Sequence, residues 1–188
     1  MTLRFIKDDG TVIGATRTMS IAARGKIWIT DQAFFLDAGN TLTQGYVQIT
    51  SSGPNLTGSV VFGDPARKTF SSSLPLVSTL RDRVVFSQLA SDSTYFTGVA
   101  ILNPNASAAN ATLDVYDASG NRIFTTVLAI PAGQRVSKLL TQFFPELVGQ
   151  SYQKGYIRLT VDQGVASFAL FGTNSLSVLS AVPPQVVP

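Results

Sequence analysis

Apolar and polar residues alternate along much of this chain, in short segments that end at turn-forming residues. Over 111–117, Leu113 and Val115 share one expected face, and the residues between them share the other. Residues 155–161 repeat this alternation, and 165–171 is almost wholly apolar, as expected of a central strand. About seven such segments in roughly 105 residues, with turn signals between them, predict an all-β fold.

The segment Leu139–Val148 differs, because its apolar residues recur at helical spacing. These residues are Leu140, Phe143, Phe144 and Leu147. Pro145 and Gly149 limit any helix there to one or two turns. The corresponding residues of the first half are Phe34, Phe35 and Leu36, preceded by Thr30 and Asp31 as plausible caps. We expect a short helix in each half, bridging two sheets.

The chain also contains an internal repeat at offsets of 108 to 110 positions. Residues 3–13 match 113–123, with the same Gly near the end of each block. The other matched blocks are 21–23 with 130–132, 32–35 with 141–144, 44–50 with 154–160, 61–63 with 170–172 and 74–75 with 182–183. A period of this length is the size of a domain, so it predicts a domain duplication and not a solenoid.

The two copies are unequal, because residues 84–112 have no counterpart in the first copy. We therefore expect tandem immunoglobulin-like β-sandwiches: an incomplete repeat over 1–77 that lacks its N-terminal strands, a linker at 78–83 and a complete repeat over 84–188. A jelly roll is the competing all-β architecture. The missing strands would bury four large apolar side chains, worth roughly 6–12 kcal/mol. The first copy is therefore predicted to be completed by upstream residues or by strands of another chain, for example in a strand-swapped dimer.

Composition narrows the function further. The chain has neither His nor Cys, which excludes histidine-based triads, thiolate nucleophiles, disulfides and most zinc and iron sites. With 45% hydrophobic and 13% charged residues, it is too apolar to be disordered, yet no apolar run is long enough to insert into a membrane. The net charge of +3 comes from scattered Lys and Arg residues in the first part, so nucleic-acid binding is not predicted.

No catalytic, metal-binding or cofactor-binding residues are predicted. Asp8-Asp9-Gly10 and residues 117–121 superficially resemble calcium loops, but they lack the alternate ligands and distal Glu of an EF-hand. A hairpin turn is the better interpretation of both. The ten Asp residues and Glu146 offer no defensible pair for carboxylate catalysis.

Trp28 and Tyr46 are the candidate contact residues for a ligand or partner. In 26–30, Trp28 shares a face with Lys26 and Thr30, opposite Ile27 and Ile29. An outward Trp, with Tyr46 on a similar surface, could stack on a sugar ring or anchor a protein. The alternative is a Trp partly covered by a loop or by the interface between copies. Tyr46 and Tyr156 both follow Gly, which favours a structural role for this Tyr in the repeat.

Four motifs of the complete copy carry a family resemblance: 95–104 (YFTGVAILNP), 117–120 (DASG), 130–133 (IPAG) and 143–145 (FFP). Through them the copy resembles the immunoglobulin-like β-sandwich repeats of large secreted or surface-attached bacterial proteins. This resemblance implies an extracellular spacer or adhesion module, with no family catalytic residues to transfer.

The sequence thus predicts a non-enzymatic structural or adhesion module of an exported bacterial protein, secreted or held at the cell surface. It would act as a spacer or protein-interaction domain, without a cofactor. Expected partners are other proteins, or a second copy through exposed strand edges, and a glycan is a further candidate. The alternatives are a carbohydrate-binding module using exposed aromatic residues and a viral or phage structural domain. Charges interrupt residues 1–7 before any apolar run, so no signal peptide is predicted there.

Overall fold

The computed structural model describes residues 1–30, 44–53, 56–63 and 69–187, and these are mostly β-strand, as the sequence predicts. They form two compact units, Met1–Thr57 and Gly58–Pro188. This division differs from the one that the repeat predicts, because residues 58–77 belong to the second unit. The predicted linker also ends in a strand, which begins at Arg81. The helix expected at Phe34–Leu36 lies outside the described residues.

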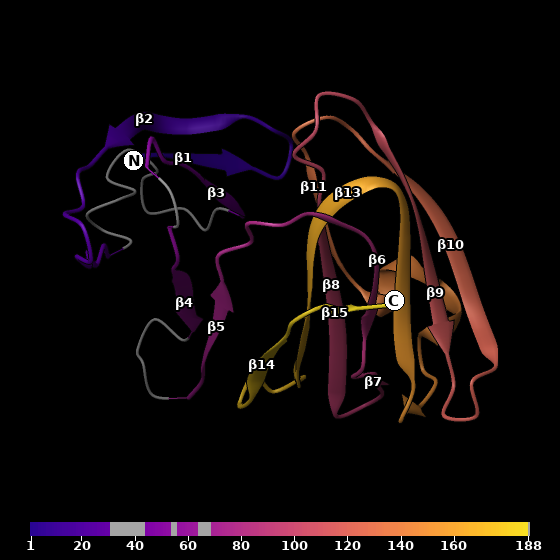
Figure 1. Cartoon of the computed structure of the whole chain (residues 1–188). Coiled ribbons are helices and arrows are strands. Elements are labelled where there is room, and N and C mark those ends of the chain that lie inside the picture. Colours follow the sequence, from indigo (N-terminus) through magenta and orange to yellow (C-terminus); the bar gives the residue numbers. More distant parts are fainter. Residues whose placement is uncertain (31–43, 54–55, 64–68, 188) are drawn as a thin grey trace. The chain divides into compact units, whose positions relative to one another are not determined.

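The first unit contains one three-stranded antiparallel sheet (Figure 1). Its strands are β1 (Thr2–Lys7), β2 (Val12–Thr18) and β3 (Gly45–Thr50), in the order β2-β1-β3. The β1–β2 turn is closed by a hydrogen bond from the Lys7 amide to the Thr11 carbonyl, at 2.8 Å. Gly10 lies in this turn at φ 86°, a conformation that glycine adopts without steric cost.

The second unit holds the remaining strands. These are β4 (Ser59–Gly63), β5 (Ser71–Pro75), β6 (Arg81–Phe86), β7 (Ala90–Ser91), β8 (Tyr95–Leu102), β9 (Ala109–Tyr116), β10 (Arg122–Ile130), β11 (Arg135–Leu139), β12 (Tyr152–Gln153), β13 (Tyr156–Thr173), β14 (Leu179–Val182) and β15 (Gln185–Val186). One layer has the order β10-β9-β13-β6-β15, and in the other β8 pairs with β11 and β13, while β14 pairs with β13.

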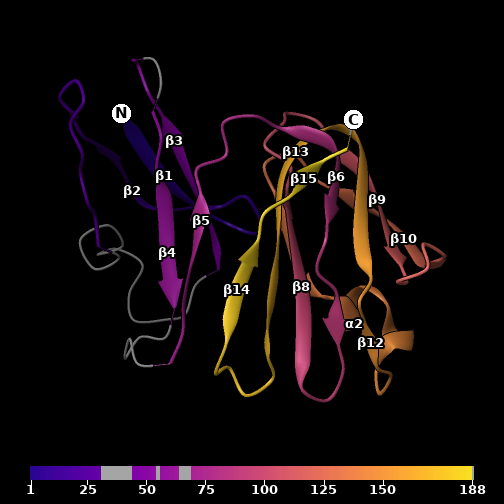
Figure 2. The same ribbon diagram turned by 60° about the horizontal axis from the view of Figure 1, so that its bottom comes forward.

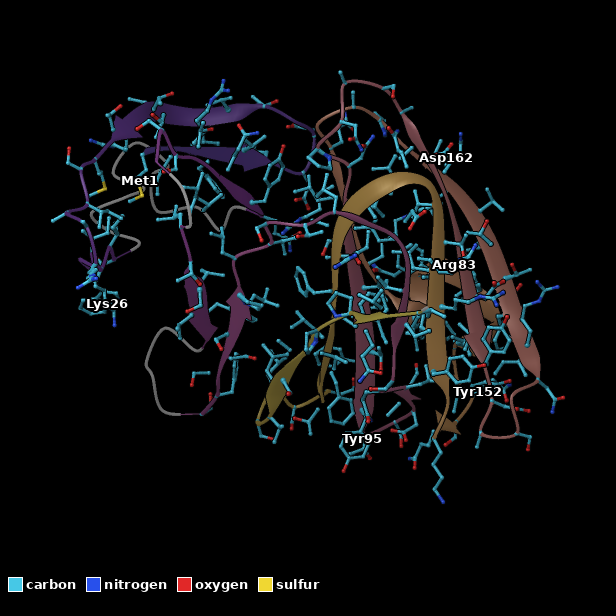
Figure 3. The ribbon with its side chains drawn as sticks, viewed as in Figure 1. Met1, Lys26, Arg83, Tyr95, Tyr152 and Asp162 are labelled. Atoms are coloured by element: carbon cyan, nitrogen blue, oxygen red, sulfur yellow. The ribbon has the colours of Figure 1, made fainter. Side chains whose placement is uncertain are left out.

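The 18-residue strand β13 belongs to both layers (Figure 2). Its first part, 156–161, pairs with β9 and β6, whereas its last part, 166–173, pairs with β8 and β14. At the bend between them, Asp162 (labelled in Figure 3) accepts hydrogen bonds from the amide and the side chain of Asn110, at 2.9 and 2.7 Å. A single strand thereby folds over the core and joins its two layers.

The core of the second unit lies between these layers. The residues predicted to face inward, Leu113, Val115, Ile157, Leu159 and Val161, are all buried, which confirms the predicted alternation. Leu and Ile side chains removed from water in this way contribute about 1.5–3 kcal/mol each.

The short helix predicted within Leu139–Val148 is present. It consists of α2 (Leu140–Phe143) and the 3-10 turn Pro145–Leu147. Leu140, Phe144 and Leu147 are buried in the core. Pro145 starts the second turn, where its missing amide proton removes no helical hydrogen bond.

The same strand pairing occurs twice, 110 positions apart. In the first unit, β1 pairs with β3 from Thr2 opposite Thr50 to Ile6 opposite Tyr46. In the second unit, β9 pairs with β13 from Thr112 opposite Thr160 to Tyr116 opposite Tyr156. Every pair between these limits in the first ladder therefore has its counterpart in the second.

Two further pairings recur in register. The β1–β2 pair of Ile6 with Val12 corresponds to the β9–β10 pair of Tyr116 with Arg122. The hairpin β4–β5 aligns Gly63 with Ser71, as the hairpin of β13 and β14 aligns Gly172 with Leu179. Parts of one strand arrangement thus recur at two places in the chain, although the β1–β2 and β9–β10 registers diverge after this first pair.

Candidate functional site

Trp28, the first predicted contact residue, lies in an irregular segment after β2 and is 81% exposed. Lys26 (Figure 3) is exposed as well, whereas Ile27, Ile29 and also Thr30, which was predicted to share the face of Trp28, are half-buried. The exposed fraction of Trp28 is that of an uncovered side chain.

Tyr46, the second predicted contact residue, lies half-buried in β3, opposite Ile6. Its counterpart Tyr156 lies opposite Tyr116 and stacks on it, with ring centroids 4.7 Å apart and planes 2° apart. Among the residues that the structure describes, Trp28 makes no ring contact, so it does not stack on Tyr46.

The glycines before both tyrosines have the same steric role. A Cβ on Gly45 would collide with the carbonyl oxygen of Ile6, and one on Gly155 with that of Tyr116. Gly45 and Gly155 are 110 positions apart in the sequence, and so are Ile6 and Tyr116, whose carbonyl oxygens they approach. Gly-Tyr in each copy therefore marks a close approach of two backbones, which explains its recurrence without a ligand.

A polar cluster that the sequence did not predict covers the other face of β9 and β13. Asp114 on β9 accepts a hydrogen bond from the Arg158 guanidinium on β13 at 2.8 Å, and Arg122 Nη1 lies 3.5 Å from its second oxygen. The Asp114 side chain is only 3% exposed. The Arg158 guanidinium also lies 5.1 Å from the centre of the Tyr116 ring. These four residues and Tyr156 form what we call the Asp114 cluster.

The charge of Asp114 is stabilised by its neighbours. Burial by itself raises the pKa of Asp114, but hydrogen bonds from Arg158 and Thr125 and the charges of Arg158 and Arg122 outweigh it and hold that pKa below its ordinary value. The hydrogen bond with Asp114 raises the pKa of Arg158 in turn. Asp114 is therefore ionised at neutral pH and closely paired with Arg158.

This arrangement suits a structural ion pair better than catalysis. A carboxylate with a lowered pKa, held by two arginines, is a weak proton acceptor. Glycoside hydrolysis needs a second carboxylate several ångströms away. Within the described ranges, no three acidic side chains gather closely enough to hold a metal ion. The Asp114 cluster joins β9, β10 and β13 on the side away from the core.

One sequence signal could have found this cluster. Asp114 and Arg158 carry opposite charges at outward positions of two predicted strands. The missing information was the register, which places Asp114 directly opposite Arg158. The first unit has Arg4 and Gln48 at the corresponding positions, so the ion pair is particular to the second unit.

Asn103 is a second buried polar group and organises a loop. It is completely buried, and its side-chain amide donates to the carbonyls of Ser107 at 2.8 Å and Ile130 at 2.9 Å. Its side-chain oxygen accepts from the backbone and side chain of Asn105, at 3.1 and 2.8 Å. The Asn-Pro and Ile-Pro-Ala-Gly motifs that carry the family resemblance thus meet at one residue, where they connect two turns.

The two Asp-rich loops are hairpin turns, as predicted. Asp9 accepts a hydrogen bond from the Thr11 amide at 2.8 Å, and Asp117 accepts from the Ser119 and Asn121 amides at 2.8 and 2.9 Å. These backbone donors lower the pKa of both carboxyl groups. The carboxylates stabilise the turns, which is the ordinary role of Asp in such positions.

The remaining candidate is the outer edge of β3. This strand closes the sheet β2-β1-β3, and no strand among the described residues pairs with its other side. The corresponding part of β13 has β9 on one side and β6 on the other. An unpaired strand edge presents backbone donors and acceptors to which another strand can add.

Comparisons with known proteins add no relative: no family model, no curated protein and no solved structure matches this chain. Across the described part of the chain, the structure has no helix long and apolar enough to cross a membrane.

Proposed function

We propose that this chain is a non-enzymatic structural module of an exported bacterial protein, built from two immunoglobulin-like β-sandwich repeats in tandem. It would serve as a spacer or protein-interaction domain, secreted or at the cell surface. The observation that carries the proposal is the recurrence of one strand register 110 positions apart. Duplication of a fold lengthens a protein and presents its edges and loops repeatedly, which suits a spacer.

The use of the polar residues supports the same proposal. The buried Asn103 connects two turns, Asp9 and Asp117 stabilise hairpins, and Asp114 joins three strands. Each of these side chains makes hydrogen bonds to other parts of the fold. A buried polar group with satisfied hydrogen bonds, as Asn103 is, favours one specific backbone arrangement.

Pulling the full chain between two handles in a force spectrometer tests the spacer function. We expect the second unit to resist force and to unfold in one cooperative event, because β13 links both of its layers. The Asn103→Ala variant should unfold at lower force, and the Ser119→Ala variant, changed at an exposed hairpin position, should behave like the parent chain. Gradual extension without a force peak would contradict the spacer function. Turnover of any substrate that Asp114→Asn abolishes would contradict the non-enzymatic assignment.

The exposure of Trp28 favours carbohydrate binding as a second candidate function. An aromatic ring that is 81% exposed can stack against the apolar face of a sugar. If this function is correct, the full chain binds defined glycans on an array and Trp28→Ala loses that signal. Val61→Ala removes another exposed apolar side chain, 69% exposed in the parent, and is the matched control. Equal signals from the parent and Trp28→Ala would rule Trp28 out as the sugar platform.

A further inference from the structure

The two copies differ at one edge of the same ladder. In the second unit, residues 157–160 of β13 pair with residues 83–86 of β6, with Thr160 opposite Arg83 (which Figure 3 labels) and Ile157 opposite Phe86. At the offset of 110, the corresponding residues of the first unit are 47–50 of β3. Over the described ranges, no strand occupies the place that β6 takes beside β13.

The β6–β13 pair shows what kind of strand fits that place. Phe86 and Val84 of β6 lie opposite Ile157 and Leu159, and all four side chains are at most 1% exposed. Val47 and Ile49, which occupy the corresponding positions in β3, are apolar β-branched residues, but they are only half-buried. The edge of β3 therefore has the side-chain chemistry of a paired strand and lacks the burial.

We propose that the outer edge of β3 binds a further extended strand, antiparallel and in the register of β6 on β13. Such a strand carries apolar side chains opposite Val47 and Ile49, with polar residues between them. The inference rests on the proposed function as an interaction module, and it names the surface and the class of partner. Main-chain hydrogen bonds supply affinity, and the two apolar positions supply register.

A second segment of the first unit agrees with this proposal. In the second unit, β11 is a strand that pairs with β8. Its counterpart over 25–29 contains the alternating run Lys26-Ile27-Trp28-Ile29, yet the structure places no strand there. Strand-like sequence without strand structure is expected where the partner strand comes from elsewhere, because one strand alone cannot form its ladder.

A second copy of this chain is the competing occupant, through β3 of one molecule against β3 of another. Comparison of the two units favours a β6-like strand. In the second unit, the strand that pairs with this edge of β13 is β6, whose sequence differs from that of β13, and not a second copy of β13. Light scattering and hydrogen exchange together separate the two cases, since pairing between two β3 edges makes the free chain a dimer whose 47–50 amides are already protected.

The direct test adds a synthetic peptide with the sequence of residues 81–89 to the full chain and measures amide hydrogen exchange. We expect exchange of the 47–50 amides to slow by about tenfold or more, while 157–160 changes little because β6 already pairs there. A peptide with the changes Val84→Asp and Phe86→Asp is the matched control and should give no protection. Protection of 47–50 by both peptides alike would contradict the proposed register.

A second form of the test supplies the strand within the same molecule. A copy of residues 79–110 is placed directly before Met1, because Met1 corresponds to Ala111 at the offset of 110. We expect protection of 47–50 and of 25–29 without added peptide. Absence of protection in both forms, or a dimer of the free chain with 47–50 already protected, would overturn the proposal. The spacer function would survive either result, because the force measurement on the second unit tests it separately.

Discussion

The ladder of β1 with β3 and the ladder of β9 with β13 have the same register but different burial. Leu113, Val115, Ile157 and Leu159 are at most 1% exposed, whereas of their counterparts Leu3 is buried but Phe5, Val47 and Ile49 are only half-buried. Pairing of two strands is determined by their own alternation and by the turn between them. Burial requires further strands on the open edge and face, and in the second unit β6 and β8 provide them.

The largest expected difference between the two ladders concerns their apolar residues. Leu159→Ala should lower the free energy of unfolding of the second unit by about 2–5 kcal/mol, because it leaves a cavity in a closed core. Ile49→Ala, at the corresponding position, should cost about 1 kcal/mol or less, because its side chain is already partly in water. Urea denaturation followed by hydrogen exchange of separate peptides measures each unit by itself. Equal losses at the two sites would contradict the comparison.

The next largest expected loss of stability comes from replacing the buried Asn103. Replacing it with Ala leaves the carbonyls of Ser107 and Ile130 without their donor, so we expect a loss of about 1–3 kcal/mol in the second unit. Asn105→Ala is the milder control, because it removes only the group that bonds to the Asn103 oxygen and to the Gly164 carbonyl. The same denaturation series measures both variants. A loss from Asn105→Ala as large as that from Asn103→Ala would show that Asn103 has no special role.

The paired glycines test whether the two close backbone approaches are equally rigid. Gly155→Ala should destabilise by about 1–3 kcal/mol, because the added methyl group meets the Tyr116 carbonyl oxygen and the Leu89 side chain. Gly45→Ala should cost less, since a three-stranded sheet can shift more easily than one closed by a second layer. Gly58→Ala, where the new Cβ would meet nothing within 4 Å, is the control. Thermal unfolding followed by circular dichroism measures the loss of stability in each variant. A larger loss from Gly45→Ala than from Gly155→Ala would contradict this interpretation.

Removing the charge of Asp114 gives the smallest expected loss of stability, and the size of this loss depends on pH. The folded-state pKa of Asp114 is lowered, so its stabilisation is fully present above the pKa of the unfolded chain, about 3.9, and is lost as pH falls through the folded value. Asp114→Asn should cost about 1–2 kcal/mol at pH 7 and flatten the decline in stability below pH 5. Asp9→Asn, in an exposed turn of the first unit, should change the second unit's profile little. Parallel profiles for the parent and Asp114→Asn would contradict a paired carboxylate.

The sequence was a good guide wherever the structure depends on neighbours in the chain. Alternation located the inward residues Leu113 and Leu159, and the spacing of Leu140 and Leu147 located the short helix. The turn residues located both hairpins. The repeat aligned Gly45 with Gly155, whose shared close contact the structure then explained.

It was a poorer guide wherever distant segments meet. Asp114 and Arg158 are 44 residues apart, and only the register makes them a pair. The hairpin of β4 and β5 matches the end of the second copy in sequence, yet it lies in the second compact unit, where the Ser72 hydroxyl accepts a hydrogen bond from the Ala181 amide at 2.8 Å.

By itself, the sequence determined which residues form strands, which face of each strand is apolar and where the chain turns, because these depend on side chains a few positions apart. Tertiary structure alone decided that β13 crosses between two layers, that an aspartate is buried beside an arginine, and that residues 25–29 form no strand. A strand needs a partner and a buried charge needs a counter-charge, and in this protein both must come from distant positions or from another molecule.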